Sequence, residues 1–208
     1  MRIAIPLFDR FTALDAVGPY EVLSRVPGAE VVFVGERTGE YRTDTGLLGL
    51  TADASLADVA PASVDVLVVP GGFGTRPLAK SPDNALVRWI GDVHPATTWT
   101  TSVCTGALLL GAAGVLDGLP ATTHWRLVDA LATYGATPVR ERVVRAGKVV
   151  TAAGVSAGID MALTLTSLLA DETAARAIQL AIEYDPQPPF DSGSYANATP
   201  ELLAALDG

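Results

Sequence analysis

Short apolar runs alternate along this chain with longer segments whose apolar residues recur at helical spacing. The runs are rich in β-branched residues and have the length of parallel strands that are buried on both faces. They occupy residues 2–8, 30–36, 65–69 and 97–103. Helices are predicted over residues 14–26, 83–93, 106–111, 125–134, 156–169, 172–183 and 199–206. This alternation predicts an α/β fold, in which a mostly parallel sheet carries helices on both faces.

Turn and capping residues refine this outline. Turn residues within 42–52 and at Gly147 predict two β-hairpins, the second of which joins 139–144 to 148–152. Proline favours a first helical turn, so Pro19 predicts that Asp15 lies at or just before a helix start.

Ser156 and Asp171 are predicted to cap the two helices that follow them. Residues 184–197 are rich in proline and carry little pattern, which predicts an extended surface segment. No repeat or linker interrupts the chain, so residues 1–208 are expected to form a single domain.

One turn stands out, because a β-branched strand there runs directly into an apolar helix. Residues 97–103 form the strand, residues 106–111 begin the helix, and Cys104 lies between them. This strand–turn–helix pattern is typical of a nucleophile elbow. The unpaired N–H groups of a helix start would stabilise a thiolate, which is the reactive form of cysteine. Alternatively, Cys104, the only cysteine of the chain, is a small buried hydrophobic residue.

Two further features follow predicted strands and should reach the same edge of the sheet, where sites of such folds lie. Asp15 could exchange a proton with the thiol, or it could be an ordinary acid at a helix start. The Gly71-Gly72 pair could direct backbone N–H groups into a site and stabilise negative charge, or it could simply form a tight turn.

Composition narrows the classes of function. The chain has 208 residues, of which 49% are hydrophobic, and a net charge of −9. Nucleic acids and anionic membranes attract basic surfaces, so neither is an expected partner. The N-terminus lacks the features of a signal peptide, and the longest apolar stretch, 107–116, is too short to cross a bilayer. A soluble cytoplasmic protein is therefore expected.

Cofactor motifs are missing from the sequence. No Gly-Lys-Ser or Gly-Lys-Thr is present, and the glycines after residue 70 do not have dinucleotide-binding spacing. His94 and His124 do not form a metal-binding pair, and there is no second cysteine. His94 is expected in a solvated loop, whereas His124 could line a pocket or be a core histidine. We therefore expect no metal and no cofactor.

Several stretches together resemble the PfpI superfamily, also called DJ-one/PfpI, which has a glutamine amidotransferase-like fold. They are L-D-A-V-G-P-Y-E-V-L at 14–23, V-V-P-G-G at 68–72, T-S-V-C-T-G-A-L-L-L-G-A-A-G-V-L at 101–116, A-T-T-H-W at 121–125, V-R-E-R-V-V-R-A-G at 139–147, G-V-S-A-G-I-D-M-A-L-T-L at 154–165 and Q-L-A-I-E-Y-D-P-Q-P-P-F-D-S-G-S at 179–194. The resemblance reaches to about residue 194, and within the superfamily it is close to the isonitrile hydratases.

This resemblance implies a fold, a reaction and a set of roles. The fold would be a flavodoxin-like three-layer sandwich. Cys104 would be the nucleophile, Asp15 the general acid and base, and Thr105 a hydroxyl that supports Asp15 or a bound water. Gly72 and Thr105 would provide backbone N–H groups. The enzyme would be a cysteine-dependent hydro-lyase that converts an isonitrile to an N-substituted formamide through a thioimidate, without a cofactor, and it would be a homodimer.

Other activities of the superfamily remain alternatives. Superfamily proteases place a histidine directly after the cysteine, where this chain has Thr105, and no obvious histidine completes an amidotransferase triad. A freestanding sensor of a small ligand and a redox or stress protein that oxidises Cys104 are both possible interpretations. Candidate pocket residues are His124 and the aromatic residues Phe73, Trp125, Tyr184 and Phe190.

Overall fold

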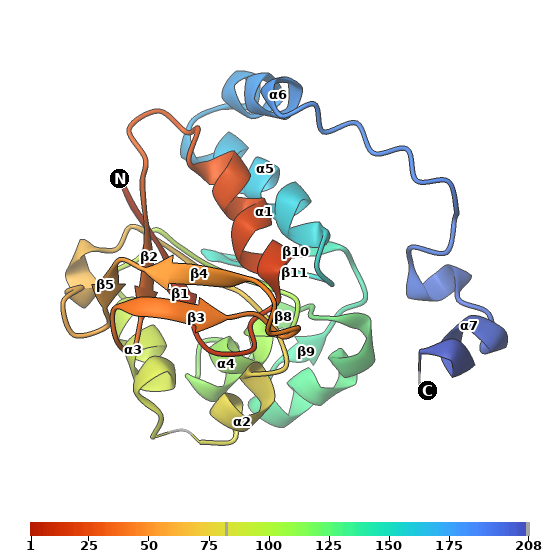
Figure 1. Cartoon of the computed structure of the whole chain (residues 1–208), viewed down its shortest axis with the longest axis horizontal. Helices are drawn as coiled ribbons and strands as arrows, with labels where there is room; N and C mark the ends of the chain where they lie inside the picture. Colours follow the sequence, from red (N-terminus) through yellow and green to blue (C-terminus); the bar gives the residue numbers. More distant parts are fainter. Residues whose placement is uncertain (82, 207–208) are drawn as a thin grey trace.

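A seven-stranded sheet forms the centre of the protein (Figure 1). The computed structural model describes residues 1–81 and 83–206. In spatial order the strands are β10 (Val143–Ala146), β11 (Val149–Ala152), β7 (Trp99–Val103), β6 (Val66–Val69), β1 (Arg2–Leu7), β2 (Glu30–Gly35) and β5 (Ala54–Ser55). All neighbouring pairs are parallel except β10 and β11, which form the predicted antiparallel hairpin. The predicted mostly parallel sheet is therefore confirmed.

Helices cover both faces of this sheet (Figure 1). On one face, α1 (Ala13–Leu23) packs against α5 (Ala157–Leu169), and α6 (Glu172–Ala181) packs on α5. On the other face, α4 (Gly106–Ala112) contacts α2 (Thr75–Ala79) and α3 (Ala85–Val93). The result is the expected three-layer sandwich. Because helices shield both sides, every residue of β6 and β7 is buried.

Smaller elements decorate the sandwich. A hairpin of β3 (Gly39–Arg42) and β4 (Gly49–Ala52) confirms the turn predicted within 42–52. The short strands β8 (Pro120–Ala121) and β9 (Thr137–Pro138) pair in parallel, and η1 (Pro61–Ser63) is a 3-10 turn. The α-helix predicted over 125–134 is instead two 3-10 segments, η2 (Trp125–Leu127) and η3 (Asp129–Tyr134). The six-residue second segment ends at Gly135, which has a positive φ of 75°.

Helix termini differ from prediction in two places. Pro19 lies inside α1 rather than in its first turn, because the helix already begins at Ala13. Its ring packs near Gly158 of α5, so a tertiary contact accompanies the lost backbone hydrogen bond. Ser156 makes no capping bond to α5, whereas the Asp171 carboxylate caps α6 by accepting from the Ala174 N–H. Because α1 begins at Ala13, Asp15 lies within the first turn of this helix rather than at or before its start.

The chain after α6 forms a separate feature. It runs as an extended segment to η4 (Tyr195–Asn197) and then to α7 (Pro200–Ala205), shown in blue in Figure 1. The predicted extended segment and closing helix are both confirmed. Almost all side chains from residue 183 to residue 206 are exposed, so this segment adds nothing to the hydrophobic core. Among the described residues, every helix is too short or too polar to span a bilayer.

Candidate active site

The predicted elbow is present, and Cys104 lies on it. Cys104 follows β7 directly and has a φ of +54°, which is rare for a residue with a side chain. Its N–H lies 3.1 Å from the Ala152 O and 2.9 Å from the Ala153 O. The Thr123 hydroxyl donates to its carbonyl at 2.6 Å. These bonds from neighbouring segments hold the turn in a conformation that the isolated chain would avoid.

Asp15 lies in the first turn of α1, where its side chain is completely buried. One carboxyl oxygen, Oδ2, accepts a hydrogen bond from the Gly71 N–H at 2.9 Å. The other, Oδ1, is buried and accepts no hydrogen bond from the part of the chain that the structure describes. One carboxyl oxygen is thus held in place, and the second is available to exchange a proton.

Burial raises the pKa of Asp15 from 3.8 to about 7, and the negative charge of Asp44 adds to this. Hydrogen bonding from the Gly71 N–H and from the Cys104 thiol acts in the opposite direction. Near neutral pH, Asp15 therefore exists both as acid and as carboxylate. This is the range in which a group can donate and accept protons efficiently.

The Cys104 thiol is not the thiolate that the helix start led us to predict. Burial, followed by the negative charge of Asp15, raises the pKa of the thiol from 9.0 to about 12. Hydrogen bonds from the Val155 and Thr105 N–H groups lower this pKa but do not outweigh burial. Val155 also has a positive φ, +26°, so two strained residues meet at the sulfur. The resting thiol keeps its proton.

The glycine pair acts differently from the prediction. The Gly72 N–H does not point into the site but donates to the Thr105 hydroxyl at 2.8 Å, and that hydroxyl lies 3.1 Å from the Gly72 O. The Gly71 N–H holds Asp15. In this structure the Gly72 N–H is therefore already paired with a side chain of the protein, and its role as a donor to the substrate stays a prediction. The Thr105 N–H, in contrast, lies at the sulfur.

Glycine is required here for space and for conformation. A Cβ on Gly71 would lie 2.7 Å from Asp15 Oδ2 and 2.7 Å from Thr105 Oγ1. Gly72 has a φ of +136°, a conformation that residues with side chains rarely adopt. The Thr105 hydroxyl and the Asp15 carboxyl pack against the same Gly71 backbone. The glycine pair therefore spaces the two side chains around the thiol.

A cavity of about 500 Å³ opens from this cluster, a volume typical of small-ligand sites. It is lined by Thr12, Asp44, Gly72, Phe73, Arg76, Cys104, Thr105, His124, Trp125, Arg126, Leu127, Val155 and Leu206. Phe73, His124 and Trp125 thus line the cavity as predicted. Tyr184 and Phe190 do not, and Phe190 is 77% exposed on the C-terminal segment.

Sequence reasoning missed several lining residues. Asp44 belongs to the turn predicted within residues 42–52, and no pattern indicates a role in the site. In the structure it accepts a hydrogen bond from the Thr12 hydroxyl at 2.8 Å and lines the cavity. Val155 follows a predicted hairpin, and only its neighbour Ser156 was considered there. Leu206 lies near the end of the chain, where no pattern of the sequence indicated a link to the site.

The two histidines also differ from expectation. His94 is half-buried, and its Nδ1 lies 2.8 Å from the Thr100 hydroxyl, so the predicted solvated loop is wrong. His124 is half-buried beside the cavity, and its Nδ1 accepts from the Arg126 N–H at 3.4 Å. Burial, and then the charges of Arg126 and Arg76, lower the pKa of His124, so its ring is neutral near pH 7.

Known proteins share this architecture. The chain is 44% identical over 194 residues to isonitrile hydratase of Pseudomonas putida, across 93% of this chain and 83% of that protein. It is 33% identical over 125 residues to the HTH-type transcriptional regulator CdhR of Pseudomonas aeruginosa, across 59% of this chain and 34% of the regulator.

The crystal structure of a ThiJ/PfpI family protein from Pseudomonas syringae superposes with a TM-score of 0.92 and 37% identity. The superposition covers 99% of this chain and 84% of that one. The sequence model of the DJ-1/PfpI family matches residues 1–168, which include the elbow, Asp15 and the glycine pair. With its fold and most of its length matched, this chain belongs to the DJ-1/PfpI family.

Proposed function

We propose that this protein is an isonitrile hydratase that adds water to an isonitrile and releases an N-substituted formamide. The observation that carries this proposal is the pairing of a thiol that lines the cavity with a carboxyl group buried next to it. A buried carboxyl, Asp15, has a pKa of about 7 and interacts with the elbow thiol of Cys104. The 44% identity to the isonitrile hydratase of Pseudomonas putida supports the same reaction.

The first step of the proposed reaction uses Asp15 as an acid. The terminal carbon of an isonitrile carries a lone pair, and it takes the proton of the Asp15 carboxyl group. This makes the carbon electrophilic, and it leaves a carboxylate beside the Cys104 thiol. The sulfur then attacks the carbon while the thiol proton passes to that carboxylate. A thioimidate forms on Cys104, and Asp15 is again protonated.

This order of proton transfers explains why a thiol with a raised pKa suits the reaction. The thiol is not needed as a thiolate at rest, because the proton acceptor appears only after Asp15 has protonated the substrate. The Val155 and Thr105 N–H groups lie at the sulfur and stabilise negative charge as the S–H bond breaks. Charge therefore develops only when the substrate is present.

The second step hydrolyses the thioimidate. Asp15 protonates its nitrogen, water adds to the carbon while one of its protons passes back to the Asp15 carboxylate, and the carbon–sulfur bond breaks. The sulfur leaves with a proton that the added water supplies, and the carbonyl of the formamide forms. One isonitrile and one water are consumed, one formamide is released, and both side chains return to their starting states. Thr105 supports this step by keeping the glycine pair, and with it Asp15, in place.

Conversion of cyclohexyl isocyanide to N-cyclohexylformamide, followed by mass spectrometry, tests this proposal. Wild-type protein is expected to form the product, whereas C104A is expected to form none. Product formation by C104A at the wild-type rate would remove Cys104 from the mechanism. No product from wild-type protein with any isonitrile would contradict the proposed function itself.

A ligand sensor is the second candidate, because the chain is similar to part of a transcriptional regulator. A sensor would bind a small molecule in the cavity without converting it. Calorimetric binding of an isonitrile without formamide production would favour this alternative. A peroxide-sensing role is supported less well, because a thiol with a pKa of about 12 offers little of the thiolate that peroxide oxidises.

We also propose that the protein acts as a homodimer, as its family resemblance implies. Exposed apolar side chains, such as Leu47 at 87% and Phe190 at 77%, offer surface that a second copy could cover. Sedimentation at micromolar concentration tests this. A monomer under these conditions would contradict it.

A further inference from the structure

The C-terminal segment, residues 183–206, touches the body of the protein at the rim of the active-site cavity. The Tyr195 ring stacks on Trp125 with ring centroids 5.1 Å apart and planes 17° from parallel. The Arg140 guanidinium lies over the same Tyr195 ring, 5.7 Å from its centre. The Arg126 guanidinium donates to the Leu206 O at 3.2 Å. Trp125 and Arg126 both line the cavity, so its wall and the segment are joined directly.

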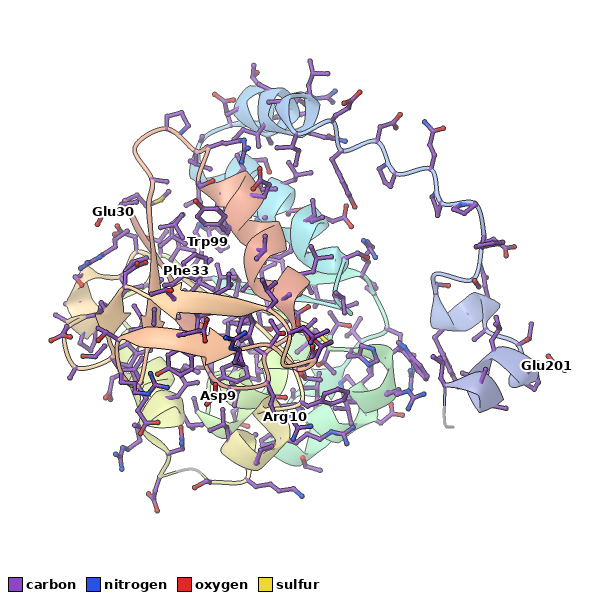
Figure 2. The ribbon with its side chains drawn as sticks, in the orientation of Figure 1. Asp9, Arg10, Glu30, Phe33, Trp99 and Glu201 are labelled. Atoms are coloured by element: carbon purple, nitrogen blue, oxygen red, sulfur yellow. The ribbon has the colours of Figure 1, made fainter. Side chains whose placement is uncertain are left out.

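Leu206 is the residue of this segment that lines the active-site cavity. It lines the same space as Cys104, yet Leu206 is 62% exposed while Cys104 is 5% exposed. The thiol therefore lies at the floor and Leu206 at the mouth. On α7, which ends just before Leu206, Glu201 points away from the body of the protein (Figure 2). A partly exposed leucine at a mouth is a surface that an apolar ligand would cover.

The linear shape of an isonitrile determines where its substituent lies when its carbon reaches Cys104. The carbon, the nitrogen and the first atom of the substituent lie on one line. When the carbon faces Cys104, the substituent must therefore extend away from the sulfur and toward the mouth. The mouth is where Phe73, Trp125 and Leu206 present apolar surface.

We propose that the C-terminal segment selects the substrate, with Leu206 as the specificity-determining residue and Tyr195 as the positioning residue. It favours isonitriles with compact hydrocarbon substituents and excludes bulky ones. This inference rests on the proposed hydratase function. The family model matches residues 1–168, so this wall lies outside the part of the chain that the model covers.

A second cavity lies next to the active-site cavity, on the side of the C-terminal segment. It measures about 510 Å³ and includes residues 193–196 of the segment. It shares His124, Trp125 and Val155 with the active-site cavity. Trp125 therefore lines both spaces, and Tyr195, which lines the second, stacks on it. Removal of the Tyr195 ring would free Trp125 to move and would give larger substituents a second path.

The test compares a compact and a bulky isonitrile, cyclohexyl and 2-naphthyl isocyanide, in wild-type protein, L206A and Y195A. L180A is the matched control, because Leu180 is an exposed leucine on α6 that does not line the cavity. In L206A, the KM for cyclohexyl isocyanide is expected to rise roughly fivefold, the effect of losing part of a leucine contact. Its kcat should stay within about twofold, since Leu206 does not touch the reacting atoms.

The preference between the two substrates is the deciding quantity. The ratio of kcat/KM values, bulky over compact, is expected to rise about tenfold in L206A and Y195A and to stay constant in L180A. Equal changes for both substrates, or equal ratios in L206A and L180A, would overturn the proposal. A chain that ends at Ala198 should behave like L206A, because α7 has no buried residue whose loss would disturb the fold.

Labelling of the thiol separates this proposal from the proposed function. Cys104 is the only cysteine, so alkylation reports on this cavity even without turnover. The quantity compared is the rate of labelling by bulky pyrene maleimide divided by the rate of labelling by small iodoacetamide. This ratio is expected to be at least fivefold higher in L206A than in wild-type protein or L180A. If wild-type protein hydrates no isonitrile, the hydratase function fails, and the labelling ratio alone decides whether the segment limits access. An unchanged ratio would overturn that claim.

Discussion

The elbow and the C-terminal segment line one cavity but are built in different ways. The elbow lies between a completely buried strand and a buried helix, and hydrogen bonds to two other segments, residues 152–153 and Thr123, hold it. The C-terminal segment is exposed along nearly its whole length, and among the described residues its contacts at the rim include the Trp125–Tyr195 stack, Arg140 over the Tyr195 ring and the hydrogen bond from Arg126 to the Leu206 O. Reacting groups need exact placement, whereas a wall that selects substrates needs only to exclude others. Changes at the elbow should therefore alter catalysis, and changes in the segment should alter selection.

Loss of the thiol should have the largest effect on activity. C104A is expected to lower formamide production by at least about 10⁴-fold, because no covalent intermediate can form. Its free energy of unfolding should change little, since alanine keeps the backbone and removes only a small buried group. Product analysis together with urea denaturation measures both quantities. An inactive and unfolded variant would show that Cys104 is needed for structure, which would weaken the contrast.

Loss of the acid should have the second largest effect. D15N is expected to reduce kcat by roughly 10²–10⁴-fold, the usual range for a general acid. An unchanged rate would remove Asp15 from both proton transfers. C104S is a useful companion, because it keeps Asp15 and tests whether the carboxyl group alone can support the reaction.

Asp15 should also make stability depend on pH. The folded protein holds its proton up to about pH 7, while an unfolded aspartate releases it above about pH 4. Stability from this group is thus present at low pH and is lost as pH rises from 4 to 7. The total is on the order of 4 kcal/mol for a pKa that rises from 3.8 to about 7. In D15N, this decline measured by denaturation should disappear.

A methyl group at the glycine pair should damage the elbow without removing a reacting group. In G71A, the new Cβ would overlap Asp15 Oδ2 and the Thr105 N, which lies 2.5 Å away. We expect a loss of about 1–3 kcal/mol in stability and roughly a hundredfold in kcat. G91A is the control: Gly91, like Gly71, has no positive φ, and the nearest atom to its Cβ would be the Ala113 O at 3.6 Å. Normal activity in G71A would show that Asp15 is not held by this loop.

Replacement of Asp44 should produce a smaller and more specific change. Its negative charge raises the pKa of Asp15, so D44N should lower that pKa. Because protonated Asp15 is the proton donor, kcat/KM should decline at a lower pH than in wild-type protein, with a loss of less than about tenfold at pH 7. A profile that moves to higher pH would contradict the assignment of Asp15 as the acid.

The smallest effect is expected from the C-terminal segment. Y195A should change the unfolding free energy by less than about 1 kcal/mol, because Tyr195 is half exposed and outside the core. Only substrate preference should change. Destabilisation equal to that of G71A would show that the segment belongs to the folded core, and the contrast between the two regions would fail.

The sequence predicted the sheet, its helices and the elbow because these depend on local patterns. Residues 65–69 and 97–103 could bury their apolar side chains only as central strands. The meeting of Asp15, the glycine pair and Cys104 followed from strand ends that share one edge. Each of these predictions relied on periodicity or connectivity, which a single sequence contains.

Other properties could not be predicted because they depend on tertiary contacts. The pKa of Cys104 reflects burial and Asp15, which outweigh the helix start that the sequence indicated. The Gly72 N–H is occupied by Thr105, an arrangement set by the distance between two loops. Pro19 lies in a helix interior because of packing against α5. Leu206 reaches the cavity from the far end of the chain, and no local pattern encodes that contact.

Intact-mass spectrometry of wild-type protein, quenched during turnover of cyclohexyl isocyanide, tests the central claim most directly. That claim is that the buried thiol of Cys104 forms a covalent intermediate with the substrate. A fraction of the protein should gain the mass of one isonitrile, peptide mapping should place it on Cys104, and C104A should show no gain. Formamide produced at the full rate with no adduct on Cys104, or with an adduct on another residue, would contradict the account.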